Sequence, residues 1–282
     1  MPMTKRLLYV FVAILTGILS PIYSAALGAD THDLPQTGSC KALEVTGNGY
    51  TVCRFHADHH KIQTHYLGKD GEPLGTFSKL ASHLDEKGGD LTFAMNAGMY
   101  DKTYAPVGFY VEHGVVLKSA NQRDGPGNFH LKPNGIFAII DTATDESQER
   151  GRIGVIAETG DFLERYAPAK ITFATQSGPM LVIDGQMHPR FLQNSKWRNR
   201  RNGVGVSADQ KTIWFVISDR FVTFHEFGSV FRDHLKVPNA LFLDGSISKL
   251  FAQNMDRHDR GRFMGPMIGV HHDRAPQSKA PH

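Results

Sequence analysis

The sequence has few of the features that mark several large classes of protein. Only two of its 282 residues are cysteines, and neither lies in a motif typical of a catalytic nucleophile or a metal ligand. No stretch concentrates lysine and arginine among aromatic residues, so the net charge of +3 gives no reason to expect a nucleic-acid partner. No internal repeat and no low-complexity linker divides the chain, and its 40% hydrophobic residues can bury a full core.

A long apolar run is also missing, apart from Leu7–Leu19 near the N-terminus. That run follows Lys5 and Arg6, is too short to span a bilayer comfortably, and leads to small residues around Ala26. This order is typical of a secretory signal peptide, which we predict over residues 1–26; a retained membrane anchor is the alternative. We therefore expect a periplasmic or secreted protein with no membrane partner once the signal is removed.

Export would place Cys40 and Cys53 in an oxidising compartment. The segment between them contains a Gly47-Asn48-Gly49 turn flanked by two strand-like runs, a pattern typical of a β-hairpin. Thiols at facing ends of a hairpin can approach within bridging distance. We predict a structural disulfide between them.

Short strand-like runs make up most of the remaining chain, and helical spacing of apolar residues begins at Thr76, Thr159 and Thr223. The predicted fold class is α+β, a single domain of mixed, largely antiparallel β-sheet with a few flanking helices. We place this domain at residues 30–272 and predict a disordered tail over 273–282.

Polar side chains stand where several strand-like runs end at a turn containing glycine or proline. The apolar run Ala240–Leu243 is too short for a helix and predicts a buried strand that ends at Asp244-Gly245. Taken alone, this pair is more typical of a hairpin turn. The recurrence of such exits nevertheless predicts that their side chains converge on one polar pocket. The other exits carry Asn96, Asn134, Gln176 and Ser177.

Cations for such a pocket are present in the loop Ser195–Asn202, which includes Arg198, Arg200 and Arg201. The alternative is that this loop is simply a solvated basic segment. The two interpretations differ in whether an arginine side chain reaches the polar pocket.

Five short segments of the chain, most of which contain the residues named above, occur in the order found in the phosphodiester glycosidase family. The resemblance to that family covers residues 60–255, and the family includes many exported bacterial proteins. Asp244-Gly245-Ser246-Ile247-Ser248 departs from the glycine-rich Asp-Gly-Gly-Gly-Ser-Ser of the animal members, so the backbone differs there. The matching segments are Asn96–Tyr100, Lys132–Gly135, Ala174–Pro179, Arg201–Gly205 and Leu243–Ser246.

The resemblance implies a hydrolase that cleaves a sugar-1-phosphodiester of the α-GlcNAc-1-phosphate type, with a carbohydrate phosphodiester as partner and a role in envelope or exopolysaccharide metabolism. Phosphate is a weak base and leaves without much help from a general acid. One carboxylate, a cation for the phosphate and polar groups for the sugar therefore suffice. We predict catalytic roles for Asp244, Arg201 and Ser177, and substrate binding by Asn96, Asn134, Gln176, Asn202 and Ser246.

The sequence requires no cofactor, although a divalent cation, Ca²⁺ or Mg²⁺, could bind the Asp244 carboxylate and nearby oxygens. Other candidate residues have simpler interpretations. Glu226 follows Thr223 at the spacing of a helix capping box, and Asp184-Gly185 is typical of a hairpin turn. His271-His272 is assigned to a polar tail with no metal ligand at suitable spacing.

A function of a different class also fits the pocket. A non-catalytic periplasmic protein could use the same polar groups to bind a phosphorylated glycan. Asp244 discriminates between the two, because a protein that only binds an anion has little reason to hold a carboxylate beside it.

Overall fold

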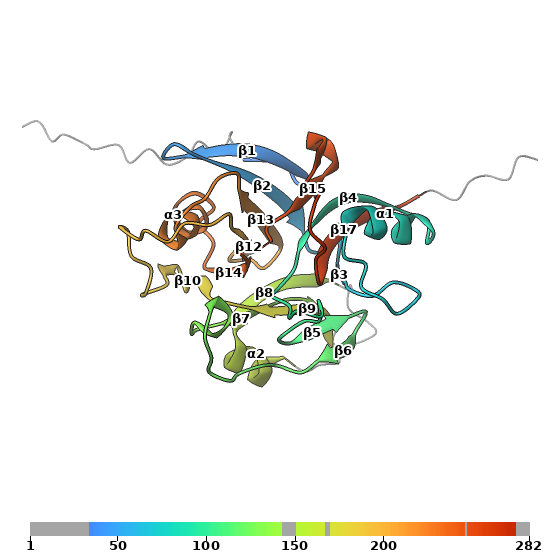
Figure 1. Ribbon diagram of the computed structural model, residues 1–282, viewed down its shortest axis with the longest axis horizontal. Coiled ribbons are helices and arrows are strands. Elements are labelled where there is room, and N and C mark those ends of the chain that lie inside the picture. The colour runs from blue at the N-terminus through green and yellow to red at the C-terminus, as the bar shows by residue number, and fades with distance from the viewer. Residues whose placement is uncertain (1–33, 143–150, 167–169, 246, 275–282) are drawn as a thin grey trace, which may run out of the picture.

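The computed structural model describes residues 34–142, 151–166, 170–245 and 247–274. The predicted signal peptide (1–26), Ser246 and residues 275–282 of the predicted tail lie outside the described residues. Within them, the chain forms three antiparallel β-sheets around one shared hydrophobic core, with a helix packed on the outer side of each sheet (Figure 1). No helix in these ranges is long and apolar enough to cross a membrane.

The largest sheet is buried on both faces because its strands alternate apolar side chains between two cores. In β13 (Thr212–Ser218), Phe215 and Ile217 point into the shared core, whereas Trp214 and Val216 belong to a second core beside α3 (Phe224–Ser229). The order of its seven strands is β1 (Ser39–Val45), β2 (Asn48–His56), β13, β12 (Asn202–Val206), β14 (Asn239–Asp244), β10 (Met180–Ile183) and β11 (Gln186–Met187).

The second sheet uses the same alternation. In β4 (Gly89–Asn96), Phe93 and Met95 enter the shared core, while Ala94 packs with Leu80 of α1 (Phe77–Asp85). Thr76 caps α1 by accepting a hydrogen bond from the Lys79 backbone. The order of the five strands is β16 (Arg257–His258), β15 (Leu250–Ala252), β4, β17 (Met267–Asp273) and β3 (Lys61–His65).

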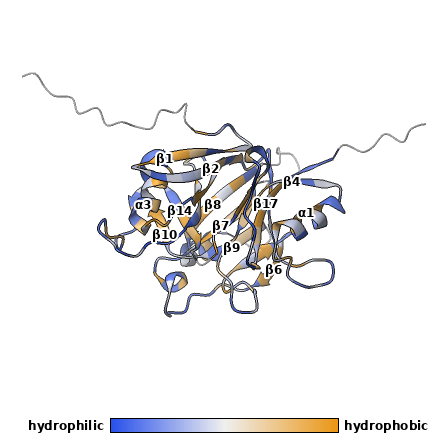
Figure 2. Cartoon of the chain, turned by 45° about the horizontal axis from the view of Figure 1, so that its top comes forward, coloured by the Kyte–Doolittle hydropathy of each residue, from blue (hydrophilic) through white to orange (hydrophobic). Residues whose placement is uncertain are grey.

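The third sheet completes the enclosure of the shared core. In β7 (Gly135–Asp141), Phe137 and Ile139 face inward, and Ile136 and Ala138 pack with Phe162 of α2 (Thr159–Arg165). Figure 2 shows hydrophobic residues gathered along β7, β8 and β9 in the middle of the molecule. The order of the five strands is β6 (Val115–Lys118), β5 (Tyr110–Glu112), β9 (Ile171–Ser177), β7 and β8 (Arg152–Glu158).

Short single-turn elements complete the secondary structure of the described residues. Of two 3₁₀ turns, η2 (Asn128–His130) follows a loop and η5 (Gln253–Met255) follows β15 directly. A π-helical turn, η4 (Val230–His234), continues α3. The predicted fold class is confirmed in its coarse form, because the described strands pair antiparallel and helices flank them.

Several local predictions are confirmed as well. Cys40 and Cys53 stand opposite each other in the β1–β2 hairpin and form a disulfide. Asp184 joins β10 to β11 with a positive φ of 47°, as expected for a tight hairpin turn. Thr223 and Glu226 form the expected capping box at the start of α3.

Two predictions at element ends need correction. The helix predicted from Thr223 is α-helical only as far as Ser229, because the Leu235 backbone N–H bonds the Val230 carbonyl five residues earlier, as in a π-turn. His271 does not lie in a tail: it is a buried residue of β17, an inner strand between β3 and β4. The predicted tail starts at Asp273, which is the last residue of that strand.

Candidate active site

The ends of strands from all three sheets meet at one place. β4 ends at Asn96, β9 at Ser177 and β14 at Asp244, and β12 starts at Asn202 beside them. Asn202 stands opposite Asp244 in the β12–β14 pair. The structure therefore brings together four of the predicted site residues from three different sheets.

Two buried amides hold both ends of the loop that follows β14. The Asn96 Nδ2 group donates to Asn202 Oδ1 at 3.3 Å, and Asn202 Nδ2 donates to the Asn96 carbonyl at 3.1 Å. Asn202 Oδ1 also accepts from the Asp244 backbone N–H at 3.1 Å. Asn96 Oδ1 accepts from the Lys249 backbone N–H at 2.9 Å. The loop from Asp244 to Lys249 is thus tied at both ends to side chains of neighbouring strands.

Ser177 contributes a further tie to the same strand end. Its buried hydroxyl donates to the Leu243 carbonyl at 2.6 Å, one residue before Asp244. This hydrogen bond connects the third sheet to the end of β14. A direct catalytic contact of Ser177 stays a prediction.

Gln176 and Asn134 belong to an adjoining hydrogen-bond network. Gln176 Oε1 accepts from the Phe109 and Asn121 backbone N–H groups, and its Nε2 donates to the Thr159 hydroxyl at 3.1 Å. The same hydroxyl donates to Asn134 Oδ1 at 2.9 Å. Gln176 Nε2 also donates to the Asn121 carbonyl at 2.8 Å, so both ends of the amide position the 109–121 segment. A contact of Gln176 with substrate stays a prediction.

A glycine permits this close packing of the sheets. Gly98 follows β4, and a Cβ atom there would lie 2.2 Å from the Gln176 carbonyl oxygen. The Gly98 backbone N–H instead donates to the Thr175 hydroxyl at 3.1 Å. Any side chain at this position would push the second sheet away from the third.

Asp244 itself is 6% exposed. Tyr100 lies near it: burial raises the pKa of the Tyr100 phenol above its ordinary value, and the negative charge of Asp244 raises it further. The Ser248 hydroxyl donates to the Asp244 carbonyl at 2.9 Å, which closes the loop locally. The carboxylate is therefore held at the end of a buried strand by a loop with fixed ends.

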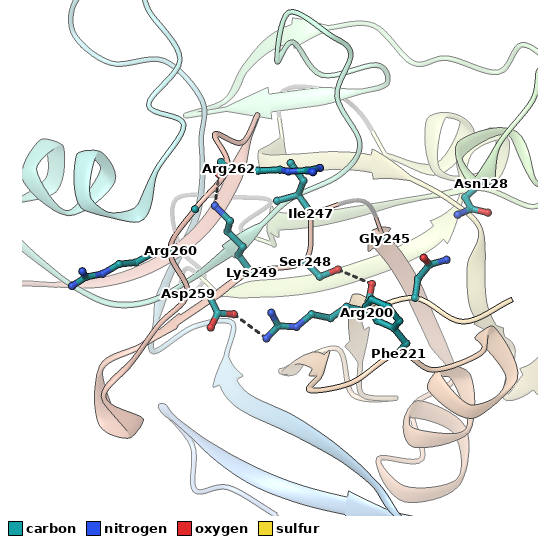
Figure 3. A pocket seen from close by; sticks show the side chains of 12 residues that line it. Asn128, Arg200, Phe221, Gly245, Ile247, Ser248, Lys249, Asp259, Arg260 and Arg262 are labelled. Atoms are coloured by element: carbon teal, nitrogen blue, oxygen red, sulfur yellow. Dashed lines mark hydrogen bonds and ion pairs between the residues drawn. The ribbon is translucent and has the colours of Figure 1, made fainter.

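The loop after Asp244 forms part of the wall of a cavity of about 810 Å³ (Figure 3). Four of the side chains that line it are cationic and only one is a carboxylate, so the cavity has an excess of positive charge. Figure 3 shows Arg200 paired to the Asp259 carboxylate, whereas the Lys249 side chain is directed toward the Arg262 backbone. The charged lining residues are Arg200, Lys249, Arg260, Arg262 and Asp259.

Lys249 is the most buried of these cations, with 8% of its surface exposed. Its Nζ donates to the Arg262 carbonyl. Burial lowers the pKa of Lys249, and the charge of Asp259 opposes that effect. Asp259 is already shared by Arg200 and Arg257, at 3.1 and 3.2 Å.

Arg201 lines a second cavity of about 320 Å³, which shares Asn128 and Asn199 with the larger one. Its guanidinium lies 3.6 Å from the centre of the Phe224 ring, while Nε donates to the Val222 carbonyl at 2.9 Å. The Arg201 side chain is buried, and its Nη1 has no hydrogen-bond partner among the described residues. Burial lowers the pKa of Arg201 to about 10.

The structure also shows residues that the sequence motifs did not single out. Lys249, Arg260 and Arg262 line the larger cavity, and Trp197 is an exposed wall of the smaller one. The Arg257–Arg262 segment is rich in arginine, which is a signal in the sequence, but it lies outside the five family segments. Only the fold brings that segment beside the loop that follows Asp244.

Metal ligands do not gather at this site within the part of the chain that the structure describes. No group of three or more histidine, cysteine, aspartate or glutamate residues in those ranges is arranged to hold a metal ion. Binding of a divalent cation at Asp244 stays a prediction.

The site is thus a polar junction of three antiparallel sheets, with a buried carboxylate whose following loop lines a cationic cavity. Residues 89–271 match the phosphodiester glycosidase family, and the chain belongs to that family. It is 32% identical over 208 residues to the uncharacterized protein YigE of Escherichia coli K12, covering 73% of this chain and 74% of YigE.

Two solved structures share the fold at low sequence identity. The catalytic domain of zebrafish N-acetylglucosamine-1-phosphodiester alpha-N-acetylglucosaminidase, auto-inhibited by its pro-peptide, superposes with a TM-score of 0.54 and 15% identity, over 83% of this chain and 81% of that one. A hypothetical protein from Synechocystis superposes with a TM-score of 0.50 and 13% identity, over 82% of this chain and 61% of that one.

Proposed function

We propose that this protein is an exported hydrolase that cleaves a sugar-1-phosphodiester, of the α-GlcNAc-1-phosphate type. The observation that carries the proposal is the position of Asp244: a carboxylate at the end of a buried strand, followed by a loop that lines a cationic cavity. Membership of the phosphodiester glycosidase family supports the type of bond. The Cys40–Cys53 disulfide is compatible with export.

In the proposed reaction, the bond between the anomeric carbon and the phosphate oxygen breaks, and its electron pair leaves with the phosphate. Water supplies the oxygen that replaces it. Because the leaving phosphate is a weak base, it needs neutralisation of its charge more than a proton from a general acid. Cationic side chains in the two cavities match that need, and Asp244 acts as nucleophile or stabilises the positive charge that develops on the sugar ring.

Arg201 is the proposed contact for the scissile phosphate. Its guanidinium is fixed by the Phe224 ring on one face and by the Val222 carbonyl on Nε, so it loses little freedom on binding. Its Nη1 group, a buried atom with no hydrogen-bond partner among the described residues, is the donor that we assign to a phosphate oxygen. An anion there would also compensate for the burial of the guanidinium charge.

The buried amides have a supporting role in this proposal. Asn96 and Asn202 fix the two ends of the Asp244–Lys249 loop, and Ser177 fixes the end of β14. A catalytic carboxylate must be held within a fraction of an ångström of its working position, and such ties provide that rigidity. The exposed Trp197, at the edge of the smaller cavity, offers a face against which a sugar ring can pack.

The test is release of GlcNAc from methyl α-GlcNAc-1-phosphate and related diesters, with and without a chelator. Hydrolysis of the α-diester, and not of the matching phosphomonoester or β-diester, is the expected result. Loss of activity with chelator, restored by Ca²⁺ or Mg²⁺, would add a metal to the site. Binding of the diester without any hydrolysis would overturn the proposal and support a glycan-phosphate binding protein.

A further inference from the structure

The two cavities hold more positive charge than a single phosphodiester can balance. A phosphodiester carries one negative charge. The larger cavity has four cationic side chains against the single carboxylate of Asp259, and the smaller cavity adds Arg190 and Arg201. Excess charge of one sign in a cleft attracts ligands of the opposite sign.

Two of these cations are buried and form no ion pair within the described residues. Arg201 is 1% exposed, and its hydrogen bonds go to the backbone carbonyls of Val222 and Trp197. Lys249 is 8% exposed, and its Nζ donates to another backbone carbonyl. An ammonium group has three N–H donors, so Lys249 can make further bonds. Burying a charge without a partner is costly, and a bound anion removes that cost.

The two buried cations line different cavities. Of the two, Arg201 lines the smaller cavity and Lys249 lines the larger one. The cavities adjoin through Asn128 and Asn199, so one extended ligand can reach both. A single phosphodiester group placed at Arg201 leaves Lys249 with no ion pair among the described residues, because the nearby Asp259 carboxylate is shared by Arg200 and Arg257.

We propose that the natural substrate carries a second anionic group, apart from the scissile phosphodiester, and that Lys249 binds this group in the larger cavity. The proposal rests on the proposed function and narrows its substrate class to acidic glycan phosphodiesters. The second group is a phosphate or a carboxylate, since both accept charge-assisted hydrogen bonds from an ammonium. Arg260 and Arg262 line the same cavity and add to its positive potential.

The structural setting of Lys249 makes it suitable for this test. Its backbone N–H is held by Asn96 and its neighbour Ser248 by Asp244, so the loop keeps its ties when the side chain changes. Lys249→Gln removes the charge and keeps a polar side chain of similar length. Lys211→Gln removes one charge from the exposed loop between β12 and β13, at the end of β12 opposite to Asn202, and serves as the control.

The experiment measures the affinity of non-hydrolysable phosphonate analogues of the α-GlcNAc diester by calorimetry, so it does not depend on turnover. One analogue carries the phosphonate charge only, a second adds a phosphate to the glycan, and a third adds a carboxylate. Wild type and Lys211→Gln should prefer a doubly charged analogue by roughly 10-fold or more, on the scale of a hydrogen bond to a charged group. Lys249→Gln should lose that preference and keep its affinity for the singly charged analogue.

The doubly charged analogue that binds more tightly identifies the second group as phosphate or carboxylate. Equal affinity of wild type for all three analogues would overturn the proposal, as would an equal loss of all three in a folded Lys249→Gln variant. Hydrolysis of the simple diester is measured separately. If the simple diester is not hydrolysed, the proposed function is wrong. The binding data still decide whether the protein prefers a doubly charged ligand.

Discussion

At the scale of single residues, similar side chains have different roles that depend on their contacts. Asn96 and Asn202 tie the loop after Asp244, whereas Gln176 positions a separate segment through Phe109 and Asn121. The sequence shows that polar residues stand at strand exits. It cannot show which donor meets which acceptor, because these partners lie up to 153 residues apart in the chain.

Replacement of Arg201 by lysine should lower activity, although the positive charge would be kept. A lysine cannot stack a planar group on Phe224 and reach the Val222 carbonyl at the same time. We expect kcat/KM for the α-diester to fall about 10-fold or more in Arg201→Lys. Wild-type kinetics in this variant would show that Arg201 only packs the loop.

The matched control for that variant is Arg198→Lys. Arg198 pairs with Glu226 at 2.7 Å near the surface, where an ion pair contributes little. Its replacement should leave kcat/KM within about two-fold of wild type.

At the scale of elements, hairpins and caps could be predicted because their signals are local. The β1–β2 and β10–β11 turns and the Thr223 capping box depend on residues a few positions apart. The sequence pattern does not reveal β17, because the polar histidines at its end resemble a tail. Only pairing with β3 and β4 makes them part of a sheet. The division into three sheets is likewise non-local, since β2 pairs with β13.

The disulfide should stabilise the hairpin without affecting the chemistry. Cys40 and Cys53 are 13 residues apart and lie on β1 and β2, at the edge of the largest sheet. Replacing both with serine should lower the free energy of unfolding by roughly 2–4 kcal/mol, mainly because the unfolded chain gains freedom. Denaturant unfolding measures this, and an unchanged midpoint would contradict it.

Acid should destabilise the second sheet through His65. Burial, and then the neighbouring His271, lowers the pKa of His65 to about 3, below its ordinary value of 6.5. The folded state therefore favours the neutral ring, and stability present above pH 6.5 is lost as pH falls from 6.5 toward 3.

The slope contributed by His65 should approach about 1.4 kcal/mol per pH unit in that window. Unfolding free energies measured at several pH values would show the slope in wild type, and His65→Gln should reduce it. An identical slope in the variant would assign the acid sensitivity to other groups.

At the scale of the whole molecule, three sheets share one core and their strand ends form one polar junction. The convergence of Asn96, Ser177 and Asp244 could be predicted from the repeated pattern of polar strand exits. The cationic cavity could not, because Lys249 and the Arg257–Arg262 segment reach it only through the pairing of β15 with β4 and β16. No single sequence motif therefore contains the whole site, which the fold assembles from segments that are far apart in the chain.

Asp244→Asn tests the central claim most directly, because it keeps the size of the side chain and removes its charge. The account predicts a folded variant, with an unchanged thermal midpoint and unchanged affinity for the singly charged phosphonate analogue. Its kcat on methyl α-GlcNAc-1-phosphate should fall by roughly 10²-fold or more, the scale of single electrostatic groups in active sites. Full activity in the folded Asn variant would contradict the assignment of Asp244 as the catalytic carboxylate.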